Sequence, residues 1–120
     1  MFYGKKGIMD AQSAIQNQRK AVRKPLHSRG NLTLNGQVLR FETVDVGVGG
    51  ICIVLPQQLT IGQLCRIDVS VFIRGKKLDI AANSKACYCV CGRDGFRVGL
   101  QFTDITEAGA SAINLYMKEK

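Results

Sequence analysis

Hydrophobic and polar positions alternate along much of the chain with the period of two that is typical of β-strands. The clearest segment is 64–73, in which positions 65, 67, 69 and 71 are apolar and Arg66, Asp68 and Ser70 lie between them. Residues 51–55 form a short apolar run that ends at Pro56, and 96–102 alternates apolar residues with small or polar ones. We therefore expect strands in these three segments.

Turn signals separate the alternating segments. Asn35-Gly36 is the strongest of them, because type I′ hairpin turns favour this dipeptide. Residues 45–50 are expected to form a flexible turn, and glycines at 62 and 75 mark two further connections. Residues 78–91 form either a strand pair or one long bent strand. Turns about every 8–12 residues predict an all-β sandwich or barrel.

The two ends of the chain lack this alternation. Thr106 and Glu107 precede apolar residues at helical spacing, which predicts a capped amphipathic helix over 106–118 that covers one mouth or edge of the sheet. Residues 1–18 are expected to be a flexible segment, in which 10–18 could form a short helix capped by Asp10. Pro25 restricts the preceding residue to extended backbone, so 19–25 is interpreted as an arm leading into one β-domain that spans 19–120.

The charge is concentrated near the N-terminus. The chain has 17 basic and 9 acidic residues, a formal net charge of +8. Seven of the basic residues but only one acidic residue lie within 1–30. This asymmetry predicts an anionic partner for the N-terminal segment, and nucleic acid, a nucleotide and an acidic membrane surface all fit it.

Cysteine usage and the absence of long apolar runs favour a cytoplasmic protein. Five cysteines, an odd number, without a secretion signal argue against a disulfide framework. No window approaches the roughly 18 apolar residues of a membrane span. Cys87, Cys89 and Cys91 would face one side of a strand about 6.6 Å apart, too far for two of them to share one zinc ion. We expect them to be small buried hydrophobes, with no metal site.

The sequence does not indicate an enzyme. His27 is the only histidine and has no nearby nucleophile or orienting carboxylate in the sequence, and the acidic residues are scattered singly. No phosphate-binding glycine loop or zinc-hydrolase motif is present. We therefore expect neither catalytic residues nor a cofactor.

Two short segments are candidates for a binding site. In Arg19-Lys-Ala-Val-Arg23, two guanidinium groups four residues apart could grip phosphate bidentately, stack on flat rings or pair with guanine O6 and N7. In Asp45-Val-Gly-Val-Gly-Gly50, the carboxylate could accept the N1 and N2 donors of guanine, and backbone amides could form an anion nest. Taken singly, the first also fits a solvated charge run and the second an ordinary turn.

In this order and spacing, the two segments resemble the PilZ domain family, whose signature is R-x-x-x-R in an N-terminal arm followed by [D/N]-x-S-x-x-G on a barrel. Arg19 and Arg23 match the first motif, and Asp45 and Gly50 match the second. The segment 96–102 (Phe-Arg-Val-Gly-Leu-Gln-Phe) and the helix after it are also similar to the end of a PilZ domain, so the resemblance covers about 18–118. It implies a six- or seven-stranded antiparallel β-barrel with a basic arm and a C-terminal helix.

The resemblance also implies a function and residue roles. It implies a bacterial receptor for the second messenger cyclic di-GMP, in which Arg19 and Arg23 hold guanine faces, Hoogsteen edges and phosphates. Asp45 would read a guanine Watson–Crick edge, and Gly50 would allow close approach of backbone and ligand. Lys20 and Lys24 are secondary candidates for ligand contact.

Gly47 departs from the family pattern, because the family usually has serine there. A missing hydroxyl hydrogen bond, worth about 0.5–1.5 kcal/mol or more when the acceptor is charged, would weaken binding by about 3- to 100-fold.

Three functions remain open at this point. The first is a cyclic di-GMP receptor, a monomer or weak dimer, whose arm orders over the ligand and then regulates a protein effector. The second is a degenerate PilZ-like module that binds a protein and no nucleotide, which Gly47 favours. The third is a small basic barrel that binds RNA or DNA. The absence of tryptophan and an aromatic content of 7% make this third function the least expected.

Overall fold

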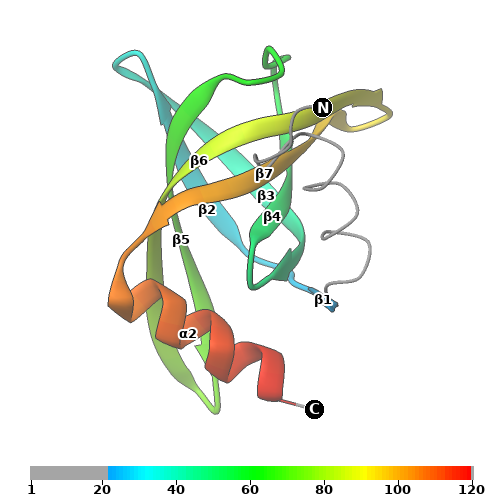
Figure 1. Ribbon diagram of the computed structural model, residues 1–120. Helices are drawn as coiled ribbons and strands as arrows, with labels where there is room; N and C mark the ends of the chain where they lie inside the picture. The colour runs from blue at the N-terminus through cyan, green and yellow to red at the C-terminus, as the bar shows by residue number, and fades with distance from the viewer. Residues whose placement is uncertain (1–21, 120) are drawn as a thin grey trace, which may run out of the picture.

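The computed structural model describes residues 22–119, which form seven strands followed by a C-terminal helix (Figure 1). In chain order the elements are β1 (Arg23–Pro25), β2 (Arg29–Leu34), β3 (Gln37–Gly47), β4 (Gly50–Leu55), β5 (Leu64–Ile73), β6 (Lys76–Gly92), β7 (Gly95–Ile105) and α2 (Glu107–Lys118). The short helix predicted at 10–18 lies outside the described residues.

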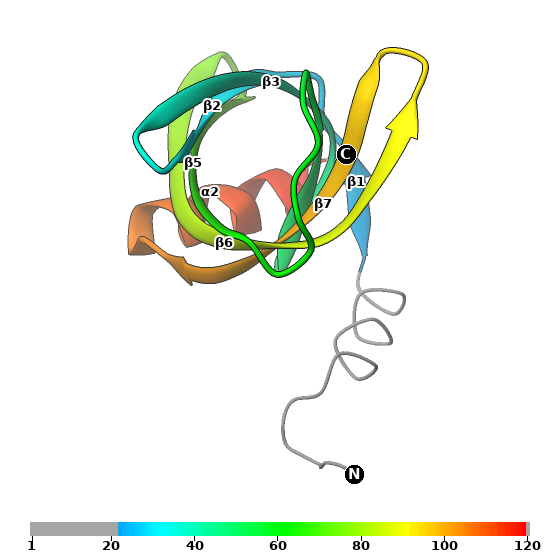
Figure 2. The ribbon, with the colours of Figure 1, turned by 90° about the horizontal axis from the view of Figure 1, so that it is seen from above.

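Six of the strands close into an antiparallel barrel. The order around the sheet is β3-β2-β5-β6-β7-β4, and pairing of β3 with β4 completes the ring, which Figure 2 shows end-on. β1 is a seventh strand that adds to β3. The expected six- or seven-stranded barrel with a C-terminal helix is therefore confirmed.

Strand β3 is long enough to pair with three other strands. Its first half, Gln37–Glu42, pairs with β2, and its last residues, Asp45–Gly47, pair with β1 along the same edge. The opposite edge of β3 pairs with β4 from Glu42 to Gly47. Arg23–Pro25, which the sequence places in an arm that leads into the domain, instead pair with β3 as an edge strand, a position where proline is tolerated.

The local signals in the sequence account for most of the turns and the core. Asn35 and Gly36 connect β2 to β3 with φ values of 50° and 80°, as a type I′ turn requires. In β5 the apolar set at 65, 67, 69 and 71 is buried inside the barrel as the alternation predicts. Residues from all six barrel strands contribute to this core, among them Leu32, Phe41, Ile53, Ile67, Ile80 and Leu100.

The segment 78–91 belongs to one long strand, β6, which excludes the strand pair considered from the sequence. Its register against β7 shifts twice, between Asn83 and Ser84 and between Ala86 and Tyr88. The second shift leaves Cys87 out of the alternation, so the three cysteines do not share one side of a regular strand. The expectation that they are all buried is wrong: Cys89 packs partly against the core, whereas Cys91 is exposed.

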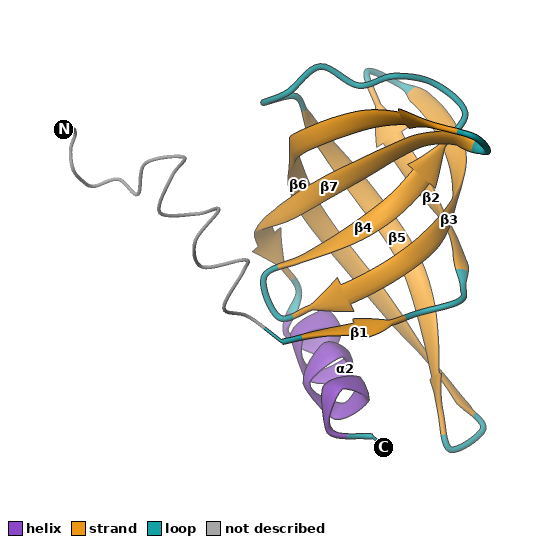
Figure 3. Cartoon of the chain, turned by 90° about the vertical axis from the view of Figure 1, so that its right-hand side faces the viewer, coloured by secondary structure: helices purple, strands orange, loops and turns teal. Residues whose placement is uncertain are grey.

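The C-terminal helix α2 covers one end of the barrel (Figure 3). Thr106 is its N-cap, and the hydroxyl oxygen accepts a hydrogen bond of 3.0 Å from the backbone N–H of Gly109. Gly109, Ala112 and Ile113 form the buried face, which packs mainly on β6 and β5. The helix therefore lies where the sequence placed it.

Candidate functional site

Strand β1 brings Arg23 to Asp45, two candidates that are 22 residues apart in the sequence. Arg23 pairs with Gly47 and Pro25 pairs with Asp45, so the arginine lies diagonally across from the carboxylate. The Nε atom of Arg23 donates a hydrogen bond of 2.8 Å to Asp45 Oδ1, and Nη2 lies 2.8 Å from the same oxygen. The two side chains are 29% and 31% exposed. This is a partly buried ion pair at the surface of the barrel.

Lys24, the residue after Arg23, reaches the C-terminal end of α2. Its Nζ atom donates to the carbonyl oxygens of Tyr116 and Glu119 at 2.8 Å and 2.7 Å, and lies 4.2 Å from the centre of the Tyr116 ring. The Tyr116 hydroxyl in turn donates to the Pro25 carbonyl at 2.6 Å. Lys24, a secondary candidate for ligand contact, is therefore engaged by the helix end, where a cation is favourable.

The predicted flexible turn at 45–50 is wrong in its extent. Asp45 and Gly47 belong to β3, Gly50 begins β4, and only Val48 and Gly49 form the turn. The candidate ligand-binding residues on the barrel, Asp45, Gly47 and Gly50, are therefore held in place by strand pairing. Of the other candidates, Arg19 and Lys20 lie outside the described residues.

The two glycines of the second motif have different surroundings. A Cβ at Gly50 would overlap the carbonyl oxygen of Leu100 on the neighbouring strand, so β4 and β7 can approach here only without a side chain. A Cβ at Gly47 would lie 3.0 Å from the carbonyl oxygen of Val22 and 3.6 Å from Arg23 Nη1. A side chain at position 47 would therefore pack directly against β1.

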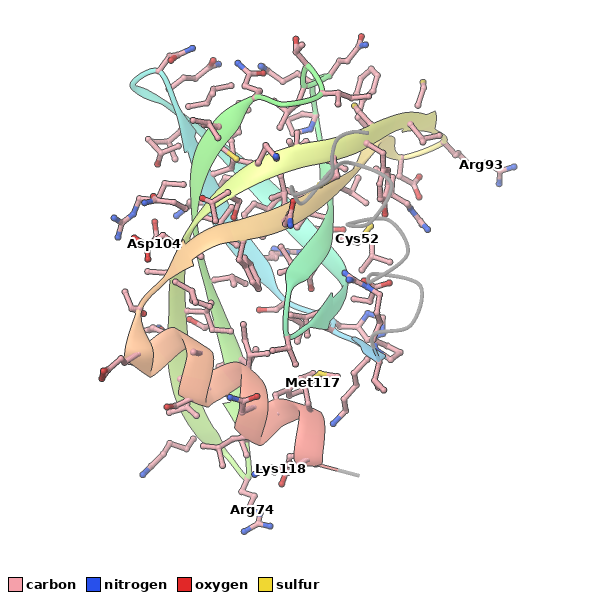
Figure 4. All side chains as sticks on the ribbon, in the orientation of Figure 1. Cys52, Arg74, Arg93, Asp104, Met117 and Lys118 are labelled. Carbon is pink, nitrogen blue, oxygen red and sulfur yellow. The ribbon has the colours of Figure 1, made fainter. Side chains whose placement is uncertain are left out.

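Neither sequence motif includes Tyr88 or the two residues that hold it, Cys52 and Gly99. The Tyr88 hydroxyl donates a hydrogen bond of 3.3 Å to the Sγ atom of Cys52, and the ring covers Gly99, where any Cβ would overlap it. Tyr88 and Arg23 both line a cavity of about 80 Å³, together with Ile51, Gly99 and Leu100. Figure 4 shows Cys52 on the same side of the barrel as the β6–β7 hairpin, whose tip carries Arg93.

No local sequence signal could identify Tyr88, because the side of β6 that it occupies depends on the bulge at Cys87. Simple alternation from Ala86, which is buried, would place Tyr88 inside the barrel. The register shift instead pairs it with Gly99 on the outer face.

Burial sets the protonation of the tyrosine and the thiol. Loss of solvent raises the pKa of Tyr88 to about 12, and the hydrogen bond to Cys52 and the nearby Asp45 act in the same direction. Burial also raises the pKa of the Cys52 thiol, although the hydrogen bond from Tyr88 opposes this. Both groups are neutral at neutral pH, so the charges of this part of the site come from Arg23 and Asp45 and from Arg97, which also acts on Cys52.

Two of the hollows elsewhere on the barrel have volumes of about 650 Å³ and 550 Å³. Both contain Arg29 and Arg40, and each also contains carboxylates, Glu42 and Asp94 in the first and Asp68 and Asp79 in the second. This mixture of charges gives them no preference for an anion. Between residues 22 and 119, there is also no group of three or more histidine, cysteine or acidic side chains that could hold a metal ion.

Comparison with known proteins identifies a family. The model of the PilZ domain matches residues 17–119, which is most of the chain. A search of curated proteins gave no match. Among the residues that the structure describes, no helix has the length and apolar character needed to cross a lipid bilayer.

Two solved structures share the fold. The Bacillus subtilis inhibitor of motility (MotI/DgrA) superimposes with a TM-score of 0.72 at 16% identity, over 82% of this chain and 48% of that protein. The PilZ domain of CeSA from a cellulose-synthesizing bacterium gives a TM-score of 0.56 at 12% identity, over 83% of this chain and all of that domain. The chain thus spans about half the length of MotI/DgrA.

The state of Tyr88 can be tested by alkaline titration. We expect the tyrosinate absorbance of the folded protein to include one step at about pH 12, because burial and the Cys52 hydrogen bond favour the neutral phenol. Unfolded tyrosine ionises near pH 10, so the contribution of Tyr88 to stability should be complete below pH 10 and fall as the pH rises towards 12. Tyr88→Phe should remove this step only, and a step that persists in Tyr88→Phe would contradict the assignment.

Proposed function

The chain belongs to the PilZ domain family, and on this basis we propose that it is a bacterial receptor that binds cyclic di-GMP and regulates a partner protein. PilZ domains are generally cyclic di-GMP receptors and regulatory modules rather than enzymes. The observation that carries the proposal for this chain is the ion pair between Arg23 and Asp45, which joins the arm motif to the barrel motif.

The ion pair has the chemistry that a guanine dinucleotide requires. The guanidinium group of Arg23 can exchange Asp45 for a phosphate or for guanine O6 and N7, all of which accept its N–H groups. The carboxylate of Asp45 then becomes available to the N1 and N2 donors of guanine. Because each group exchanges one partner for another, the ligand need not leave a buried charge unpaired.

Contacts of β1 with α2 support a route from the ligand to a partner. Arg23 faces the site, while Lys24 and Pro25 contact the last turn of α2 through Tyr116 and Glu119. β1 has only three residues, so a change at Arg23 acts on residues directly bonded to the helix end. We expect ligand binding to loosen this contact and to expose the end of α2 to a protein effector.

One structural neighbour is an inhibitor of motility, a role that is compatible with action on another protein. For this chain the partner, the cytoplasmic location and the monomeric or weakly dimeric state are part of the same proposal.

Gly47 supports one alternative, a protein-binding module that does not bind nucleotide. The family's usual serine hydroxyl is missing, and β1 lies close to the space that a side chain at 47 would fill. In this alternative the ion pair only fastens β1 to the barrel.

Substitution of either partner of the ion pair tests the proposal. We expect Arg23→Ala and Asp45→Asn each to weaken cyclic di-GMP binding about 10- to 100-fold, the value of one or two charge-assisted hydrogen bonds, in calorimetric titrations. Arg40→Ala, which removes an exposed arginine of β3, is the matched control and should bind within about twofold of wild type. Absence of heat with the wild-type protein would exclude the receptor function, and an equal loss in Arg40→Ala would exclude a specific role for Arg23.

Restoring the family's serine separates the receptor from the alternative. We expect Gly47→Ser to bind cyclic di-GMP about 3- to 100-fold more tightly, provided that the Val22 carbonyl, 3.0 Å from the new Cβ, can move by a few tenths of an ångström. A lower melting temperature of Gly47→Ser would show that the Val22 carbonyl cannot make this movement. If wild type does not bind and Gly47→Ser does, the degenerate module is the correct description.

The contact between β1 and α2 makes the switching mechanism testable by hydrogen exchange. Saturating cyclic di-GMP should speed amide exchange in the last turn of α2 if Lys24 and Tyr116 separate on binding. Lys24→Met should show fast exchange in this turn without ligand and little further change with it. Unchanged protection in ligand-saturated wild type would rule out this route.

A further inference from the structure

Tyr88 lies in the same row of the outer barrel surface as Asp45. Asp45 pairs with Cys52, Cys52 pairs with Gly99, and Gly99 pairs with Tyr88, so the row crosses β3, β4, β7 and β6. The row extends about 14 Å between its outer strands, because neighbouring strands are about 4.7 Å apart. The Tyr88 side chain shortens this span by reaching back over Gly99 to Cys52, the direct neighbour of Asp45.

The contacts of Tyr88 hold the ring in place and leave part of it open. One part rests on Gly99 and the hydroxyl is bonded to Cys52, yet the residue remains 39% exposed. Tyr88 and Arg23 line a common cavity, and Tyr88 supplies the aromatic side chain of its lining. An aromatic ring that is fixed before binding loses little conformational freedom when a second ring stacks on it.

We propose that Tyr88 is a further ligand-contacting residue of this site, whose ring supplies a stacking face for a guanine base of the dinucleotide on the side opposite Arg23. The inference rests on the proposed function and adds to it a residue outside both sequence motifs. A guanidinium group and an aromatic ring both favour the flat face of a base, so the two together form the walls of a slot.

The present size of the slot implies an order of events. A volume of about 80 Å³ corresponds to two or three water molecules, too little for a base. Arg23 is one of the walls and is held by Asp45, so release of the ion pair both frees the carboxylate and widens the slot. The Tyr88 ring remains packed on Gly99 while Arg23 moves.

The roles of Asp45 and Tyr88 in selectivity should differ. A carboxylate that accepts two base N–H groups distinguishes guanine from adenine, whereas stacking on a ring is tolerant of the base because every base has a flat face. Loss of Tyr88 should therefore lower the affinity for cyclic dinucleotides without changing their ranking. Loss of Asp45 should change the ranking.

Calorimetric titrations with cyclic di-GMP and cyclic di-AMP test the proposal. Tyr88→Leu should weaken cyclic di-GMP binding about 5- to 150-fold with the same preference for guanine, and Tyr88→Phe, which keeps the ring, should stay within about threefold of wild type. Phe72→Leu is the matched control, because Phe72 is 64% exposed and lies beside the Arg74–Gly75 turn, away from the row. It should bind as wild type does.

A spectroscopic measurement keeps the test independent of the stability of the variants. In wild type, saturating cyclic di-GMP should move the ring-proton NMR signals of Tyr88, assigned by their loss in Tyr88→Phe, to lower frequency, as expected for protons that face a stacked base. Unmoved Tyr88 signals, or binding by folded Tyr88→Leu within twofold of wild type, would overturn the stacking role and leave the receptor function standing. A wild-type protein without affinity for cyclic di-GMP would overturn both.

Discussion

The pairing of β1 with the end of β3 is the interaction on which the candidate site depends. β3 continues past the end of its pairing with β2, and the exposed edge that remains accepts Arg23–Pro25. Backbone hydrogen bonds thereby fix a residue of the arm against a residue of the barrel. Without this pairing, Arg23 would be a charged side chain at the start of the domain, and Asp45 would be an unpaired carboxylate on a strand.

Alternation along β1 gives its neighbouring basic residues different partners. Arg23 forms the ion pair with Asp45, and Lys24 binds the carbonyl oxygens at the end of α2. Arg23 and Lys24 are thus engaged by two separate parts of the fold. In the proposed mechanism, an anion that attracts Arg23 would compete with Asp45, and the resulting change in β1 would reach the end of α2 through Lys24.

Two glycines shape the barrel surface beside the ion pair, because each lets a neighbouring group approach closer than a side chain would permit. Gly50 permits close packing of β4 against β7, and Gly99 provides the seat for the ring of Tyr88. Cys52 completes the arrangement as the acceptor for the tyrosine hydroxyl, and burial keeps both groups neutral. The result is an uncharged surface close to Asp45 and to the cations Arg23 and Arg97, and the proposed binding of a ligand with planar bases and phosphates builds on this arrangement.

The sequence by itself determined most of the barrel strands, the Asn35-Gly36 hairpin and the capped C-terminal helix, because each is encoded by residues close together in the chain. The motif residues Arg23, Asp45, Gly47 and Gly50 could also be chosen from the sequence, by residue type, spacing and resemblance to the family motifs. Only the tertiary structure decided that Arg23 meets Asp45, that Lys24 is occupied by α2 and that Tyr88 faces outward. The first two depend on contacts between residues 22 to 95 positions apart, and the third depends on a bulge fixed by the partner strand. No local pattern encodes such long-range geometry.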